Sequence, residues 1–351
     1  MSRGLKLEID LNALRHNCNR IQNTLPNTAN MGAAVKADAY GLGVNKVAPL
    51  LYQEGIRDFF VARIGEADVL NNILPHDRNI YILDGLTSEN DRKICQSKGY
   101  LPVINSFDQA ARAGDLPIAL HIDTGMNRLG IRDQEANDPR LQRLNIKLLM
   151  THAASADVPD SPQTQDQYKC FEKVRKYFPG IPASFANSAA SLSTPEYACD
   201  MARPGIALYG GWSLPHTQTG IRDVVSLSAP VLQIRKVMAG EAVGYGAQYI
   251  AARDMDVATL GIGYADGLFR NLGDKGIIAL NGKICPMVGR ISMDLTTVDI
   301  SNMQTPPTPG QHAEIIGPNI PLQAFAEKAG TIGYEVLTRL GKCMEKCYSG
   351  G

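Results

Sequence analysis

The sequence predicts an α/β protein that joins a (β/α)8 barrel, over residues 1–219, to a mainly antiparallel β domain, over residues 220–351. In the first part, short and nearly continuous apolar runs alternate with stretches of helical length, as is typical of parallel strands buried on both faces. In the second part the helical period largely disappears and turn residues separate the apolar runs. A length of 351 residues is sufficient for two domains.

The first residues predict a strand followed by a helix. Leu5, Leu7 and Ile9 alternate with polar residues, which indicates a strand. Asp10 is a suitable N-cap for a helix over residues 11–21, because apolar residues of that segment recur at helical spacing.

Eight apolar runs predict the strands of the barrel, and most are separated by enough chain for a crossover helix, such as residues 64–74. Eight strand-then-helix units favour a closed barrel over an open sheet. The runs are 31–36, 58–62, 79–83, 101–104, 117–122, 146–150, 182–186 and 200–204.

Polar residues lie at or just after the carboxyl ends of these runs, where the loops of such a barrel build an active site. Polar residues often end apolar runs, but a lysine, a histidine and an arginine together are harder to explain in that way. We therefore expect the active site at this end of the barrel. The residues are Lys36, Asp84, Asn105, Asp123, His152, Asn187 and Arg203.

The remainder of the chain predicts strands, one hairpin and one helix. Asn281-Gly282 between two apolar runs is a strong signal for a type I′ turn. The single predicted helix covers residues 322–330, and a linker rich in glycine and polar residues is expected at 210–223. The predicted strands lie within 224–237, 256–267, 276–280, 283–289 and 295–300.

Composition argues against several classes of protein. Basic and acidic residues number 35 each, so the formal net charge is zero and we expect neither nucleic acid nor a membrane as partner. No apolar run approaches the roughly 20 residues that span a bilayer, and the first residues lack the apolar core of a signal peptide. Seven scattered cysteines suggest reduced thiols in a cytoplasmic protein rather than a disulfide framework or a metal site.

A series of short motifs is more specific, and in this order it resembles the landmarks of the alanine racemases over nearly the whole chain. The resemblance implies a barrel plus a β domain, the cofactor pyridoxal 5′-phosphate (PLP), and an enzyme that interconverts L-alanine and D-alanine. The motifs are AVKADAYGLG (34–43), GMNRLG (125–130), THAASAD (151–157), NSAAS (187–191), RPGIALYG (203–210), VGYG (243–246), GIGYADG (261–267), VGRISMD (288–294) and TIGYE (331–335).

Racemisation removes a proton from one face of Cα and delivers one to the other, so two bases on opposite faces suit it. The resemblance implies that Lys36 holds the cofactor and acts as one base, and that Tyr245 is the other. A lysine at the end of a buried strand fits this role, because burial favours the neutral, nucleophilic amine. His152 and Arg203 match the residues that assist the tyrosine, and Arg203 also matches the arginine that faces the pyridine nitrogen.

The resemblance also implies a set of cofactor contacts. Hydroxyls of Tyr40, Ser188 and Tyr334 and backbone amides of Gly205 and Ile206 match the groups that hold the phosphate. Ser188 also precedes a predicted helix, where an N-cap serine is the plain structural alternative. The remaining cofactor-binding residues are Arg128, His152 and Asn187.

Substrate contacts are implied at Arg128, Met293, Tyr264 and Asp294, of which Tyr264 and Asp294 match residues at the active-site entrance. In the family, the residues matching Tyr245, Tyr264 and Met293 come from the neighbouring subunit, so we expect a homodimer with composite active sites. The substrate is expected to be a small amino acid. Alanine versus serine stays open, as does synthesis of D-alanine for the cell wall versus its breakdown.

Three features depart from the family pattern. His121 stands where many relatives carry a lysine, carbamylated in some, that supports the arginine matching Arg128. A hydrogen bond from His121 or a bound anion are the alternatives. Leu42 replaces a common histidine, and the tail over residues 338–350 lacks the usual ending and receives no role.

Two rival functions fit the sequence less well. A PLP-dependent amino-acid decarboxylase of the same plan uses an acidic partner for the pyridine nitrogen, against which Arg203 argues. A non-enzymatic PLP-handling barrel lacks a long second domain, against which residues 220–351 argue.

Overall fold

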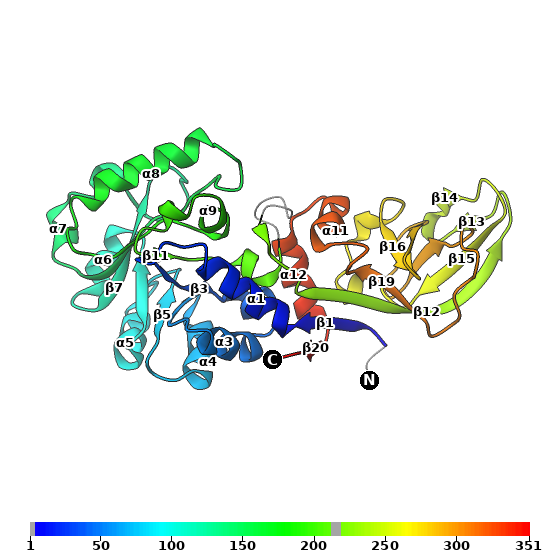
Figure 1. Cartoon of the computed structure of the whole chain (residues 1–351), viewed down its shortest axis with the longest axis horizontal. Coiled ribbons are helices and arrows are strands. Elements are labelled where there is room, and N and C mark those ends of the chain that lie inside the picture. The colour runs from blue at the N-terminus through cyan, green and yellow to red at the C-terminus, as the bar shows by residue number, and fades with distance from the viewer. Residues whose placement is uncertain (1–3, 212–218) are drawn as a thin grey trace.

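The computed structural model of the chain describes residues 4–211 and 219–351. Two lobes lie side by side along its long axis, with a barrel in blue to green and a β-rich lobe mainly in yellow to orange (Figure 1). Part of the predicted linker, residues 212–218, lies outside the described residues.

The predicted barrel is confirmed, since each of the eight apolar runs contains a strand. Neighbouring strands pair in parallel from β3 to β10, and β11 pairs with β2. Amides of Asp200 and Arg203 donate to the carbonyls of Ala183 and Ala186, both at 2.9 Å, which joins β11 to β10 and closes the barrel. The strands are β2 (Asn30–Met31) with β3 (Ala33–Ala34), β4 (Asp58–Val61), β5 (Asn79–Ile82), β6 (Leu101–Ile104), β7 (Pro117–Asp123), β9 (Asn145–Met150), β10 (Ala183–Ser184) and β11 (Met201–Ala202); β8 (Ile131–Arg132) pairs beside β7.

Helices cover the outside of the barrel, and side-chain caps start several of them. Ser88 Oγ accepts from the Asp91 amide at the start of α5, and Ser106 does the same for Gln109 in α6. The interior of the barrel is filled by a separate buried cluster of strand residues. Its members are Phe60, Tyr81, Leu101, Val103, Ala119, Leu148, Met150 and Met201. The helices are α3 (Val44–Gln53), α4 (Ile64–Ile73), α5 (Glu89–Lys98), α6 (Phe107–Ala113), α7 (Pro139–Gln142), α8 (Pro162–Arg175) and α9 (Ser188–Ser193).

The second lobe is mainly antiparallel, as predicted, and is built around the long strand β12 (Val225–Val237). The expected hairpin joins β16 to β17, and its turn residues Asn281 and Gly282 have φ of 53° and 75°, as a type I′ turn requires. The other strands are β13 (Ala242–Val243), β14 (Tyr249–Ile250), β15 (Met255–Leu260), β16 (Ile277–Leu280), β17 (Lys283–Pro286), β18 (Thr296–Asp299) and β19 (His312–Ile316).

Both chain ends belong to the sheet of the second lobe. Strand β1 (Lys6–Asp10) pairs antiparallel with β12 and parallel with the last strand, β20 (Lys346–Ser349). The prediction of one helix near the end was wrong, because α12 (Gly333–Cys343) follows α11 (Leu322–Ala329). Helix α12 buries Val336, Leu337 and Leu340 between the two lobes.

No helix within the described ranges is both long and apolar enough to cross a membrane. All seven cysteines lie among the described residues and are free thiols.

The predicted N-cap of α1 (Leu11–Gln22) is confirmed, since Asp10 Oδ1 accepts from the amides of Asn12 and Ala13 at 2.8 and 3.0 Å. Replacing Asp10 with alanine should therefore lower the free energy of unfolding by about 1 kcal/mol. Asparagine caps as well as aspartate, so Asp10→Asn should remain close to the parent. Denaturant unfolding followed by circular dichroism compares the two variants, and equal stability of Asp10→Ala and the parent would contradict this role for the cap.

Candidate active site

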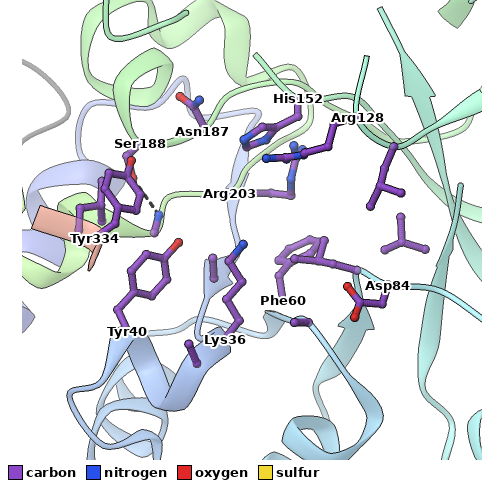
Figure 2. Close-up of a pocket in the computed structure, with 18 of the residues that line it drawn as sticks. Lys36, Tyr40, Phe60, Asp84, Arg128, His152, Asn187, Ser188, Arg203 and Tyr334 are labelled. Atoms are coloured by element: carbon purple, nitrogen blue, oxygen red, sulfur yellow. Dashed lines mark hydrogen bonds between the residues drawn. The ribbon is translucent and has the colours of Figure 1, made fainter. Parts of the chain in front are cut away.

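A cavity of about 710 Å³ opens at the carboxyl ends of the barrel strands. It is lined by five of the polar strand-end residues noted in the sequence, namely Lys36, Asp84, His152, Asn187 and Arg203. In Figure 2, Lys36 and Tyr40 extend toward its centre from one side, and His152 and Arg128 lie across from them. The other predicted residues along its wall are Tyr40, His121, Arg128, Ser188, Gly205, Ile206 and Tyr334.

The predicted residues of the second lobe do not line this cavity within the described chain, apart from Tyr334 on α12. Tyr245 lies between β13 and β14 and is 70% exposed, and Met293 is 55% exposed. Tyr264 and Asp294 are half-buried at other points of the second lobe. The described chain therefore supplies Lys36 to the cavity but not Tyr245.

Two strand-end residues shape the site from behind its wall. Asp123 Oδ1 accepts from the amides of Gly125, Met126 and Asn127 at 2.9–3.1 Å. These bonds fold the loop that carries Arg128. Asn105 contacts His121, as described below.

Lys36 begins a turn of unusual backbone geometry. The four residues after it, Ala37 to Tyr40, have φ between 53° and 58°, in the left-handed region. This conformation raises the free energy of a residue other than glycine by about 1–2 kcal/mol. Contacts with neighbouring groups must therefore stabilise the turn. Glu66 does so at the start, where Oε1 accepts from the Ala37 amide and Oε2 from the Ala62 amide, both at 2.7 Å.

Burial lowers the pKa of Lys36, and the positive charge of Arg128 lowers it further. Glu66 and Asp84 oppose the shift by stabilising the ammonium. The net effect enlarges the neutral fraction of the amine, which is the form that attacks a carbonyl carbon.

Hydroxyl groups gather at one end of the cavity. Ser188 Oγ accepts from the amides of Gly205 and Ala207 at 2.8 and 3.3 Å, the first of which is drawn in Figure 2. Because its oxygen already accepts these bonds, the serine hydrogen is what remains to be donated to a ligand. Asn187, not Ser188, caps α9, since Asn187 Oδ1 accepts from the Ala190 amide at 3.2 Å.

Two tyrosines complete this hydroxyl cluster. The ring of Tyr40 lies 4.7 Å from that of Tyr209 and 6.0 Å from that of Tyr334. Burial raises the pKa of Tyr40 well above its usual value and that of Tyr334 to about 12. Both hydroxyls therefore stay protonated and can donate. A β-carbon at Gly205 would come within 2.3 Å of the Tyr40 oxygen, so a side chain there would displace the Tyr40 hydroxyl.

Arg203 is a buried guanidinium on the opposite wall. It donates to the Thr151 carbonyl at 2.6 Å and to Ser184 Oγ, and its Cζ lies 5.8 Å from the centre of the Phe60 ring. Burial lowers its pKa to about 10, so it remains charged near neutral pH. No carboxylate of the described residues forms an ion pair with Arg203.

His121 has a proton position that its neighbours determine. The Asn105 amide nitrogen donates to the carbonyls of Leu83 and Val103 at 3.0 and 2.9 Å, so Asn105 Oδ1 is the acceptor of the 2.8 Å contact with His121 Nδ1. His121 Nδ1 therefore carries a proton. Burial, then the charge of Arg203, lowers the pKa of His121 to about 4, which leaves its Nε2 as a neutral acceptor.

Sequence reasoning missed several residues that act here. Glu66 lies inside a predicted helix, and Phe60 lies within a strand, so neither had a local signal. Ile332, Glu335 and Thr338 line the cavity from α12 or just before it, a helix that was not predicted.

Comparison with known proteins agrees with this architecture. A family model described as "Alanine racemase, N-terminal domain" matches residues 9–212, and one described as "Alanine racemase, C-terminal domain" matches residues 224–348. The chain belongs to the alanine racemase family. It is 40% identical to a curated alanine racemase of Rhodospirillum rubrum, with 98% of this chain and 96% of the relative covered.

Solved alanine racemases share the whole fold. The crystal structure of the Bartonella henselae alanine racemase, with covalently bound pyridoxal phosphate, has a TM-score of 0.94 at 35% identity and covers 98% of this chain and 99% of that one. The biosynthetic alanine racemase of Pseudomonas aeruginosa has a TM-score of 0.91 at 31% identity, with 99% of each chain covered. The predicted family is thus confirmed.

The two cavity histidines should stay neutral in mildly acidic solution. The pKa of His152 falls to about 3, through burial and then the charge of Arg203, and that of His121 to about 4. Above pH 6.5 the imidazoles are neutral in both the folded and the unfolded chain. As the pH falls from 6.5 toward 4, the unfolded chain binds protons that the folded chain does not, so these residues lower the free energy of unfolding.

Nitrogen-detected NMR of the histidine side chains tests both the charge and the tautomer. We expect the His121 ring to be protonated at Nδ1 alone, and to remain so at about pH 5.5. The His121→Gln variant identifies the resonance. A His121 ring protonated at Nε2, or one that titrates above about pH 6, would contradict the geometry at Asn105.

Proposed function

We propose that the chain is a PLP-dependent racemase that interconverts L-alanine and D-alanine by two-base proton transfer at Cα. The observation that carries the proposal is the Lys36 amine, which has a lowered pKa and lies in the barrel cavity of an alanine racemase-family chain. Lys36 acts on one face of the substrate, and Tyr245 of the partner subunit acts on the other.

The cavity fits PLP in its donor chemistry. The hydroxyls of Tyr40, Ser188 and Tyr334 and the amide of Ile206 can donate to the phosphate, whereas the Gly205 amide donates to Ser188 Oγ in the described structure and supports that hydroxyl. Asn187 and His152 lie along the same wall. PLP bound through Lys36 supplies an electron sink that acidifies the Cα–H bond of the substrate.

Arg203 is assigned to the pyridine nitrogen. Because a guanidinium holds its proton, Arg203 donates a hydrogen bond without transferring the proton to the ring. Arg203 would thereby keep a pyridine ring bound here neutral, and a neutral ring would withdraw electrons less strongly than a pyridinium. The rival decarboxylase requires an acidic residue here, whereas the described structure has this buried arginine.

Arg128 is assigned to the substrate carboxylate and the phenolic oxygen of the cofactor. Its guanidinium suits two anionic groups, and it lines the cavity beside His121. His121 cannot be carbamylated, but its neutral Nε2 offers Arg128 an acceptor without adding a charge. This tautomer is the one that a hydrogen bond from Arg128 to His121 Nε2 requires, and a bound anion stays the alternative.

The position of Tyr245, the proposed second base, supports a homodimer with composite active sites. Tyr245 and Met293 are exposed on their own subunit and lie outside its cavity lining, so a partner is needed to bring them to a substrate. In this assembly Met293 binds the substrate carboxylate through its backbone amide, and Tyr264 and Asp294 narrow the entrance in favour of small amino acids. His152 and Arg203 lower the proton affinity of the incoming tyrosine.

The remaining assignments concern the whole chain. We divide it at residues 219 and 220, with the PLP-binding barrel before this point and the domain that carries Tyr245 after it. The free thiols of the seven cysteines support a reducing compartment such as the cytoplasm.

A chiral assay of the purified protein tests the activity directly. L-alanine should be converted to an equal mixture of the two enantiomers, and borohydride should fix the cofactor on the peptide containing Lys36. Lys36→Ala should abolish both results. Assays with serine and alanine side by side measure the substrate preference. A borohydride adduct on another lysine, or no D-alanine, would overturn the assignment.

A heterodimer experiment tests the composite site. Lys36→Ala and Tyr245→Phe should each lower kcat by at least about a hundredfold, because each removes one proton-transfer group. In a heterodimer of the two variants, one site carries both changes and the other carries neither. The heterodimer, purified through two different tags, should therefore regain about half of the parent activity. A heterodimer as inactive as both homodimers would mean that Tyr245 acts together with Lys36 of its own subunit, which would overturn the composite site.

A further inference from the structure

The end of the chain, to which the sequence assigned no role, contacts the turn that follows Lys36. Strand β20 lies beside β1, and two of its side chains reach across to the barrel. Lys346 Nζ lies 3.0 Å from Asp38 Oδ2, and the Tyr348 hydroxyl donates to the Leu42 carbonyl at 2.9 Å. Asp38 and Leu42 both lie on the turn between Lys36 and α3.

The alternation of β20 separates these two residues from their neighbours. Lys346 and Tyr348 are half-buried, whereas Cys347 and Ser349 between and after them are exposed. Successive side chains of a strand point to opposite faces. One face of β20 is thus directed at the turn and the other at solvent.

Asp38 links the tail to the barrel through both oxygens. Oδ1 accepts from the Val44 amide at 2.7 Å, which closes the loop onto the start of α3, while Oδ2 pairs with Lys346. Asp38 is also one of the four left-handed residues after Lys36. The ion pair therefore acts on the segment whose backbone sets the directions of Lys36 and Tyr40.

Helix α12 brings the tail into this position by direct backbone contact. A β-carbon at Gly341 would lie 2.0 Å from the Gly41 carbonyl oxygen, and one at Gly41 would lie 2.4 Å from the Leu337 carbonyl oxygen. A β-carbon at Gly43 would likewise lie 2.0 Å from the Tyr348 oxygen. The turn and the tail are therefore packed without space for a side chain between them.

We propose that β20 is a clamp on the left-handed turn, and that Lys346 and Tyr348 are positioning residues for Lys36 and Tyr40. Neither residue lines the cavity, so neither contacts substrate or cofactor within the described chain. The clamp acts by limiting the freedom of residues 37–43, and loss of such positioning lowers the rate more than the affinity for substrate. This inference rests on the proposed function for its catalytic consequence only.

Lys346→Met and Tyr348→Phe, singly and together, test the clamp in the PLP-loaded enzyme. Cys347→Ser is the matched control, since it changes the outward face of the same strand. In the double variant we expect kcat to fall on the order of tenfold, KM for alanine to change less than about twofold, and PLP to leave faster in the presence of a scavenger. Lys346→Arg keeps the ion pair and should restore the Lys346 contribution.

Hydrogen exchange measured by mass spectrometry provides a readout that depends on neither activity nor cofactor. Peptides covering residues 36–46 should exchange faster in both single variants than in the parent and the Cys347→Ser control. Asp38→Asn and Lys346→Met should have less than additive effects when combined, because they remove the same contact.

Two results would overturn the clamp: unchanged exchange in residues 36–46, or a loss of kcat that only follows a fall in the fraction of folded protein. A parent enzyme without racemase activity would refute the proposed function instead, and the exchange data would still decide the clamp.

Discussion

The left-handed turn after Lys36 is the constraint on which the site depends. Four consecutive residues other than glycine adopt positive φ there, and a free chain would relax from this conformation. Glu66 holds the start of the turn, Asp38 holds its end, and Gly41 allows a helix of the other lobe to touch it. Because the turn is fixed from several directions, the Lys36 amine points into the cavity and the Tyr40 ring packs toward the hydroxyl cluster.

Charge within the cavity follows from the same enclosure. Arg128 and Arg203 line one desolvated space, and burial together with their positive charges holds His121 and His152 in the neutral form. Besides the carboxylates of Asp84 and Glu335, the walls thus offer cations and neutral donors to an anionic ligand. Neutral imidazoles add hydrogen-bonding capacity to the cavity. If they were protonated, they would be a third and a fourth cation and would repel the two arginines.

The sequence predicted the barrel well because each strand is a local signal, a buried apolar run with a polar end. It also placed Lys36, Asn187 and Arg203 on one cavity, since the carboxyl ends of all barrel strands share one rim. The features that the sequence could not predict depend on contacts between residues far apart in the chain. The tail segment 346–349 has no apolar pattern, and becomes a strand only because β1 lies beside it. Glu66 gives no signal within its helix, since its role comes from amides at Ala37 and Ala62.

The pairing of β1 with β20 has a consequence for how the protein is made. Strand β1 can pair with β20 only after residues 346–349, which follow it at a great distance along the chain, have been synthesised. The barrel strands, which pair mostly with their successors along the chain, can associate earlier. During translation the edge of β1 that pairs with β20 therefore stays unpaired. Unpaired strand edges in nascent chains can associate with other proteins. The shortness of β1, at five residues, and its alternating polar side chains limit that exposure.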